Sequence, residues 1–135
     1  MEFGGINYLA VLVAAVAAFA AGAIYYGALG KPWMKAARID PADTRMSPTL
    51  FAINFVCELV MAWVLAGVIG HLGDGEVTVR NGVISGAFVW LGFIATAMTV
   101  NHRYQGFGWN LTLIDSGHWL IVAILMGGII GAFGV

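Results

Sequence analysis

The sequence predicts an all-α integral membrane protein that folds as a four-helix bundle, and three observations lead to this fold class. Of the 135 residues, 61% are hydrophobic and only 10% are charged, whereas a soluble domain has about 25% charged residues. The mean hydropathy is +0.90. Four apolar segments each have about the 20 residues that a helix needs to cross the hydrocarbon core of a bilayer. We therefore expect residues 1–135 to form a single transmembrane domain with short loops.

The four spans are expected at roughly residues 6–29, 49–70, 82–100 and 111–133. The first is not expected to be a cleaved signal peptide, because no Lys or Arg precedes its apolar run. For the second, Ser47 as the N-cap and Pro48 in the first turn predict the start of the helix. For the fourth, Asn110 is a candidate N-cap, since its side chain can accept from early backbone N–H groups.

The end of the first span carries helix-breaking residues beside aromatic and basic ones. Gly27, Gly30 and Pro32 predict a break in the helix where the basic residues begin. The next residues, about 32–39, have the pattern of a short interfacial helix on anionic lipid. A substrate role for this stretch is a less favoured alternative. The interfacial residues are expected to be Tyr25, Tyr26, Lys31, Trp33, Lys35 and Arg38.

The distribution of the basic residues predicts the orientation of the chain. The first and third loops together hold five of the six basic residues, and the other side holds only Arg80. The positive-inside rule therefore places these two loops in the cytoplasm, and both termini on the non-cytoplasmic side. The five residues are Lys31, Lys35, Arg38, Arg45 and Arg103.

The charge and the single cysteine exclude some classes of function. The net charge of −1 and the isoelectric point near 6.2 give no basic field, so nucleic acid is not an expected partner. Cys57 cannot form a disulfide within the chain. The expected partners are the lipid bilayer and either further copies of the chain or a larger membrane complex.

Small residues at helical spacing are candidates for close helix contacts, which drive association where lipid gives no hydrophobic advantage. Gly82 and Gly86 form one such pair, and Gly127 and Gly131 form another. Contacts within the chain and contacts between subunits both remain open. Trp90 lies near the middle of the third span, and we expect it to face protein because its indole N–H needs an acceptor.

The second span contains a carboxylate that is costly in a bilayer. Glu58 lies ten residues after Pro48, which places it about 15 Å along the helix and near mid-bilayer. Asn54 lies one turn earlier on the same face. The carboxyl group can be protonated, pair with Asn54 and other helices, or line a wet cavity. It is therefore either a structural hydrogen bond between helices or an intramembrane polar site for a proton or cation.

A second polar group surrounds the third loop and the start of the fourth span. Asp115 and His118 lie three residues apart on one helix face, and His102 and Arg103 arrive from the end of the third span. An ion pair between Arg103 and Asp115 that closes the hairpin is the structural interpretation. The functional interpretation is a polar cytoplasmic mouth in which His118 exchanges protons near neutral pH.

Motifs for enzymatic chemistry are absent from the sequence. The acidic and histidine side chains form no close metal-binding pattern such as His-Glu-x-x-His. Ser116 has no nucleophile elbow around it, and Cys57 has no activating base or cation beside it. No phosphate-binding loop occurs. We therefore expect no metal, no cofactor and no enzymatic activity.

The segment from Asn7 to Ala36 resembles a known family through an early Asn, an Ala-rich first helix and two short motifs. These are Tyr25-Tyr26-Gly27 and Gly30-Lys31, the latter followed by Trp33-Met34. This pattern is similar to the domain-of-unknown-function 1761 family. The later stretch "LTLIDSGHWL" is similar to the Leu-x-x-x-Asp-x-Gly segment of that family. The resemblance implies a small four-span protein of the bacterial inner membrane, and it implies no activity.

Two functions from different classes follow from these observations. The first is a small unit, acting as a homo-oligomer, that binds or passes a proton or small solute through Glu58. The second is an accessory or scaffold subunit of a larger membrane complex, in which Glu58 only joins helices. A lipid-modifying enzyme would need a catalytic constellation that the sequence lacks.

Overall fold

The computed structural model describes residues 5–43 and 47–134, and the regular structure of these residues is entirely helical. Four helices are long and apolar enough to cross a membrane, which confirms the predicted fold class. The elements are α1 (Tyr8–Ala37), η1 (Pro41–Asp43), α2 (Pro48–Gly70), α3 (Val79–Val89), η2 (Trp90–Ala95), α4 (Thr96–Tyr104) and α5 (Trp109–Phe133). The third span consists of α3, η2 and α4 in one continuous helix of 26 residues.

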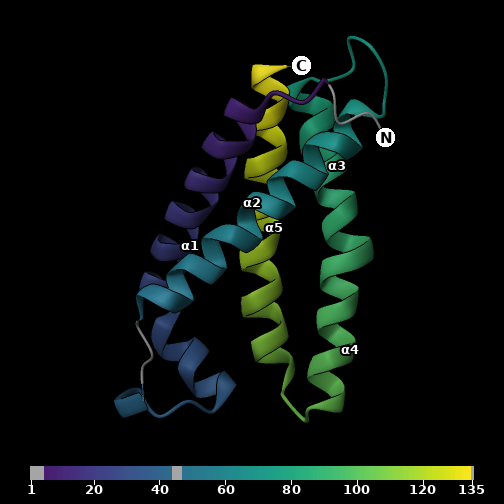
Figure 1. Ribbon diagram of the computed structural model, residues 1–135. Helices are drawn as coiled ribbons and strands as arrows, with labels where there is room; N and C mark the ends of the chain where they lie inside the picture. Colours follow the sequence, from purple (N-terminus) through teal and green to yellow (C-terminus); the bar gives the residue numbers. More distant parts are fainter. Residues whose placement is uncertain (1–4, 44–46, 135) are drawn as a thin grey trace.

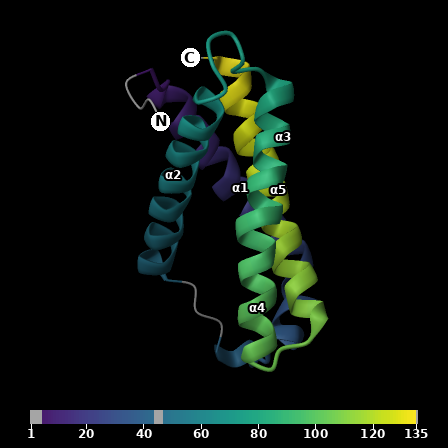
Figure 2. The ribbon, with the colours of Figure 1, turned by 90° about the vertical axis from the view of Figure 1, so that its right-hand side faces the viewer.

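The helix α5 lies at the centre of the bundle (Figure 1). α1 packs along one side of it, and α3 packs most closely along another. α2 runs diagonally across α1 and α5, and it diverges from α4 toward its own N-terminal end (Figure 2). The α1–α2 and α4–α5 connections lie at one end of the molecule, whereas α1 begins and α5 ends at the other.

Side chains cap three of these helices at their N-termini. The Ser47 hydroxyl accepts from the backbone N–H of Leu50 at 3.1 Å, which confirms the predicted start of α2. Asn7 and Thr78 cap α1 and α3 in the same way. The predicted Asn110 cap is wrong, because α5 begins at Trp109, one residue before it. Gly108 takes the N-cap position and makes no side-chain hydrogen bond there.

The predicted break in the first helix is also wrong. α1 continues through Pro32 and ends only at Ala37, where the C-cap residue Arg38 has a left-handed backbone (φ 59°) that turns the chain. Proline lacks the N–H that would bond the carbonyl four residues earlier, so it bends a helix that is held by contacts on both sides. Figure 1 shows this change of direction in the lower part of α1. The interfacial position of residues 32–39 stays a prediction.

The third span contains a π-helical segment, η2, that the sequence did not indicate. A π-helix fits one extra residue into a turn and shifts the side chains that follow it around the axis. At its first residue, the indole N–H of Trp90 donates to the carbonyl oxygen of Ser116 on α5 at 2.7 Å. The prediction that Trp90 faces protein is therefore confirmed.

Glycines bring α3 and α5 into backbone contact. A Cβ atom added at Gly82 would overlap the carbonyl oxygen of Gly127, and the reverse substitution meets the same obstacle. Gly86 lies equally close to the carbonyl of Ala123, and Gly131 to that of Thr78. These four glycines, here called the glycine seam, therefore form contacts within the chain. The seam consists of Gly82, Gly86, Gly127 and Gly131.

Candidate functional site

Glu58 is completely buried in the bundle, with an exposed fraction of 0%. Neither carboxyl oxygen has a hydrogen-bond partner, so the pairing with Asn54 that the sequence allowed is not formed. Asn54 lies one turn away and is only half-buried. Glu58 is thus buried, and its carboxyl group forms no interhelical hydrogen bond.

Small residues of α1 make room for the second helix at this depth. The ring of Phe19 packs at 6.1 Å against those of Phe51 and Phe55, which sets the register between α1 and α2. Ala14 and Ala18 of α1 are both fully buried. Their methyl groups offer no donor or acceptor, and neither carboxyl oxygen of Glu58 has a hydrogen-bond partner.

His118 lies in a cage of aromatic rings between α1 and α5. Its ring centroid is 4.9 Å from that of Tyr26, 5.6 Å from that of Tyr25 and 4.6 Å from that of Trp119. The side chain is 5% exposed, and its Nδ1 atom has no hydrogen-bond partner. A Cβ atom at Gly22 would come within 3.0 Å of Nε2, so the cage depends on the absence of a side chain there.

The two tyrosines of α1 bind α5 directly. The Tyr26 hydroxyl donates to Oδ1 of Asp115 at 2.6 Å, and the Tyr25 hydroxyl donates to the Ile114 carbonyl at 2.6 Å. A Cβ atom at Gly117 would lie 2.9 Å from the Tyr25 hydroxyl oxygen. The sequence assigned both tyrosines to the interface with lipid, and it missed that they hold Asp115 and surround His118. Gly22, which faces the His118 ring, and Gly117, which faces Tyr25, are the sequence features that could have indicated this close packing.

Arg103 forms no ion pair with Asp115, so the predicted closing contact of the α4–α5 hairpin is wrong. Its Nη2 atom instead donates to the carbonyls of Phe107 and Gly108 at 3.0 Å and to the Thr112 hydroxyl at 2.8 Å. The guanidinium also stacks over Trp109 at 3.8 Å. The carbonyls of the turn are closer to Arg103 than the carboxylate one helical turn further along α5, so the charge is used to close the turn.

The residues expected at the cytoplasmic mouth therefore separate into two groups. Asp115 and His118 lie with the tyrosines of α1. His102 lies with Arg103, and its Nδ1 atom is 2.9 Å from the Thr112 hydroxyl. Thr112 is 4% exposed and joins both side chains, a role that no sequence pattern indicated.

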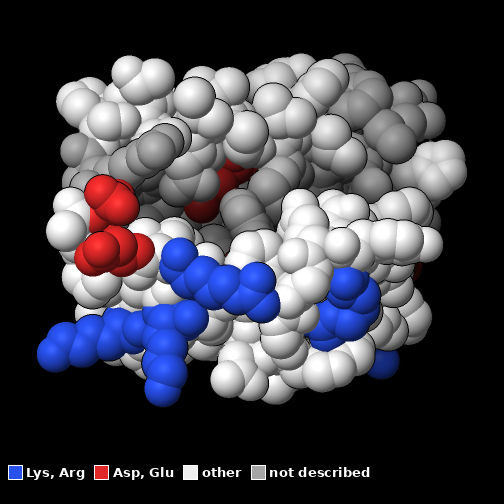
Figure 3. Space-filling model, turned by 90° about the horizontal axis from the view of Figure 1, so that it is seen from below, with Lys and Arg blue, Asp and Glu red and all other residues white. Residues whose placement is uncertain are grey.

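The same end of the molecule carries the remaining interfacial candidates. Arg38 donates to the Gly106 carbonyl at 2.6 Å and so joins the two loops. The Trp33 ring packs at 5.5 Å against that of Tyr26, while Lys31 and Lys35 are exposed. Figure 3 shows basic side chains along one side of this end, with acidic atoms deeper inside. Arg45 lies outside the described residues.

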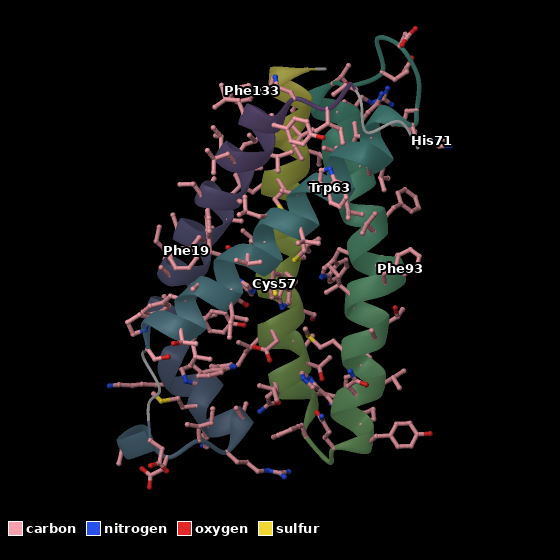
Figure 4. The ribbon with its side chains drawn as sticks, in the orientation of Figure 1. Phe19, Cys57, Trp63, His71, Phe93 and Phe133 are labelled. Atoms are coloured by element: carbon pink, nitrogen blue, oxygen red, sulfur yellow. The ribbon has the colours of Figure 1, made fainter. Side chains whose placement is uncertain are left out.

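Glu58 and His118 lie on different helices, and both side chains are buried. His118, on α5, lies beside Gly22 of α1. Figure 4 labels Cys57, the neighbour of Glu58 in the chain, where α2 crosses α5. The structure thus presents two buried titratable side chains, one on α2 and one on α5. The residues described here bring no three His, Cys, Asp or Glu side chains close enough to hold a metal.

No curated protein and no solved structure matches this chain. A family model described as "Protein of unknown function (DUF1761)" matches residues 9–131, which is nearly the whole sequence. The chain therefore belongs to the DUF1761 family, as its first-helix motifs suggested.

Proposed function

We propose that this protein is an intramembrane binding and permeation unit for a proton or small solute, with Glu58 as its inner station. One observation carries the proposal: the Glu58 carboxyl group is fully buried and neither of its oxygens has a hydrogen-bond partner. An unsatisfied buried polar group costs about 1–3 kcal/mol. A residue that only joined helices would offset that cost with a partner, so the bare carboxyl supports a role in binding.

His118 and Asp115 form the second station, closer to the basic end. The imidazole has an unpartnered Nδ1 atom inside its aromatic cage. Asp115 is held by Tyr26 and is partly exposed, so it can meet water. An imidazole can both take up and release a proton near neutral pH. A proton would pass from water to Asp115 and His118, and then to Glu58.

The unit acts in the bacterial inner membrane and as a homo-oligomer in this proposal. Five of the six basic residues belong to the first and third loops, which the positive-inside rule places in the cytoplasm. Four helices enclose little space for a complete pathway, and a groove lined by α2, α3, η2 and α5 opens on the side where α2 diverges from α4 (Figure 2). A neighbouring copy would close that side.

The same divergence favours a second candidate function, an accessory subunit of a larger membrane complex. In that case a helix of a different protein would cover the open side. Purification in mild detergent should then yield a stoichiometric partner. Recovery of the chain as copies of itself alone would count against this alternative.

Proton flux into proteoliposomes tests the proposal. Wild-type protein should acidify the lumen, as reported by a trapped pH-sensitive dye, when a pH gradient and a counter-ion pathway are imposed. Glu58→Gln should reduce the flux to the level of empty liposomes, because the amide cannot carry the proton. Asp43→Asn, which removes an exposed acid, is the matched control and should retain full flux. Absence of flux in wild type, or unchanged flux in Glu58→Gln, would refute the proposal.

A further inference from the structure

Two arginine side chains from distant parts of the chain meet at the α4–α5 loop. Arg38, at the end of α1, donates to the Gly106 carbonyl at 2.6 Å, and its guanidinium lies 5.1 Å from the centre of the Phe107 ring. Arg103, in the last turn of α4, donates to the Phe107 and Gly108 carbonyls at 3.0 Å. Phe107 therefore lies between the two positive charges, with its ring toward one guanidinium and its carbonyl toward the other.

Neither of these charges is neutralised by a carboxylate in the described part of the chain. The hydrogen bonds of both guanidinium groups go to backbone carbonyls and to the Thr112 hydroxyl. For Arg103 these bonds all use Nη2, whereas Nη1 is buried and has no hydrogen-bond partner. A guanidinium has more N–H donors than these contacts occupy, and it donates them in parallel pairs to the oxygens of a phosphate. The two arginines therefore offer donors to an anion that reaches the loop.

The start of α5 adds to the positive potential at this loop. Gly108 is the N-cap and supplies no side-chain acceptor to the first N–H groups of α5. The N-terminal end of a helix carries a partial positive charge, which favours a nearby anion. The Arg103 guanidinium lies 3.8 Å from the ring of Trp109, the first residue of α5. This ring is 59% exposed, so it can turn aside and uncover the guanidinium.

The loop lies at the ends of two apolar helical spans, where lipid headgroups are expected. The third span ends at Tyr104 and the fourth begins at Trp109, and these side chains are 91% and 59% exposed. Exposed aromatic side chains at the ends of spans are typical of the headgroup region. Basic sites between transmembrane helices at this level bind the headgroups of anionic lipids. Position and charge together therefore favour a lipid phosphate as the anion.

We propose that Arg38 and Arg103 hold the phosphate group of one anionic phospholipid, which joins the end of α1 to the α4–α5 loop. Such a site differs from the general attraction of basic residues to anionic lipid. A guanidinium binds a phosphate through two parallel N–H bonds, a geometry that the ammonium group of lysine does not reproduce. The site involves neither Glu58 nor His118, so it is independent of the proposed function.

Native mass spectrometry of the full chain in detergent tests the site with phosphatidylglycerol as the probe and phosphatidylcholine of the same acyl chains as the control without net charge. Wild-type protein should bind one phosphatidylglycerol per chain at least about tenfold more tightly than phosphatidylcholine. Arg38→Lys and Arg103→Lys should each weaken this binding by about tenfold, although both keep the positive charge. Lys35→Gln removes an exposed charge at the same end and should change the binding by less than about twofold. If Arg103→Lys fails to fold, Arg38→Lys at its exposed position decides alone.

The indole N–H signals of the tryptophans locate the bound lipid by NMR in detergent micelles. Phosphatidylglycerol should shift the signal of Trp109, which covers Arg103, and leave that of Trp90, which is bonded to the Ser116 carbonyl. Equal affinity of wild type for the two lipids would overturn the site, and so would an unshifted Trp109 signal. Equal effects of Lys35→Gln and the arginine variants would show a general attraction and would also overturn it. An equal shift of Trp109 by inorganic phosphate at the same concentration would overturn the lipid as the ligand.

Discussion

The hydrogen bond between Tyr26 and Asp115 joins α1 to α5 beside His118. It joins a phenol of α1 to a carboxylate of α5 at 2.6 Å, and the Tyr26 ring also covers His118. Removing the hydroxyl leaves the carboxylate without its donor while keeping the ring in place. The variant therefore separates the hydrogen bond from the aromatic cage.

Tyr26→Phe is expected to lower the free energy of unfolding by about 1.5–3 kcal/mol, the range for hydrogen bonds to charged groups. Reversible unfolding in mixed micelles measures this quantity. Tyr104→Phe is the matched control, because Tyr104 is 91% exposed and should change stability by less than about 0.5 kcal/mol. Equal effects of the two variants would show that the contact with Asp115 contributes nothing.

For single residues, the sequence predicted the burial of a polar side chain better than its hydrogen-bond partners. The burial of Glu58 follows from the cost of a charge in lipid. Its lack of a hydrogen-bond partner does not follow from the sequence, because it depends on which side chains of the other helices reach it. Arg103 binds the carbonyls of the turn and not the predicted Asp115. Distances of a few ångströms likewise decide this choice of partner.

At the scale of elements, the glycine seam sets the distance between α3 and α5. Each of its four glycines faces backbone atoms of the opposite helix, so a methyl group there cannot be accommodated by rotating a side chain. The π-helical segment follows directly below the seam. Gly92 lies within that segment, and a Cβ atom there would meet no atom within 4 Å.

Gly127→Ala should destabilise the protein by about 1–3 kcal/mol or more, because the added methyl forces the two backbones apart. Gly92→Ala should be neutral or should stabilise by up to about 1 kcal/mol, since alanine favours helix over glycine. Thermal unfolding in detergent, monitored by circular dichroism, compares the pair. A similar loss in both variants would mean that helix propensity and not packing governs the seam.

The positions of the helices were predictable, while their internal details were not. The lengths of the apolar segments predicted all four spans, and Ser47 with Pro48 predicted the residue at which α2 begins. The break expected at Gly27, Gly30 and Pro32 is a bend, because hydrogen bonds with α5 before Pro32 and with the α4–α5 loop after it hold the segment in place. The π-helix depends on a contact of Trp90 with a helix distant in sequence, which local patterns do not encode.

At the scale of the whole molecule, the basic residues define one end. Arg38 bonds the Gly106 carbonyl across the two loops, which confirms that these loops share an end. The rule that assigns this end to the cytoplasm acts during insertion, so the orientation is still a prediction. The relative placement of α2 and α4 could not be predicted, because no sequence pattern distinguishes a closed bundle from one that is open on one side.

Cysteine labelling tests the orientation. In a Cys57→Ala background, Asp74→Cys in the α2–α3 loop should react with a membrane-impermeant maleimide applied to intact spheroplasts. Gln105→Cys in the α4–α5 loop should react only after permeabilisation. Both residues are exposed, so access depends on the side of the membrane alone. The reverse pattern would invert the predicted topology and place the second station on the opposite side.

In the proposed function, Glu58 exchanges its proton with water although its side chain is fully buried. Infrared difference spectroscopy of the protein in bilayers observes the carboxyl group itself when the bulk pH is stepped. We expect a reversible carboxyl band in the wild type that is missing in Glu58→Gln and that persists in Asp43→Asn. A spectrum with no carboxyl band assignable to Glu58 at any pH at which the protein stays folded would contradict it, because a carboxyl group sealed from water cannot serve as a station.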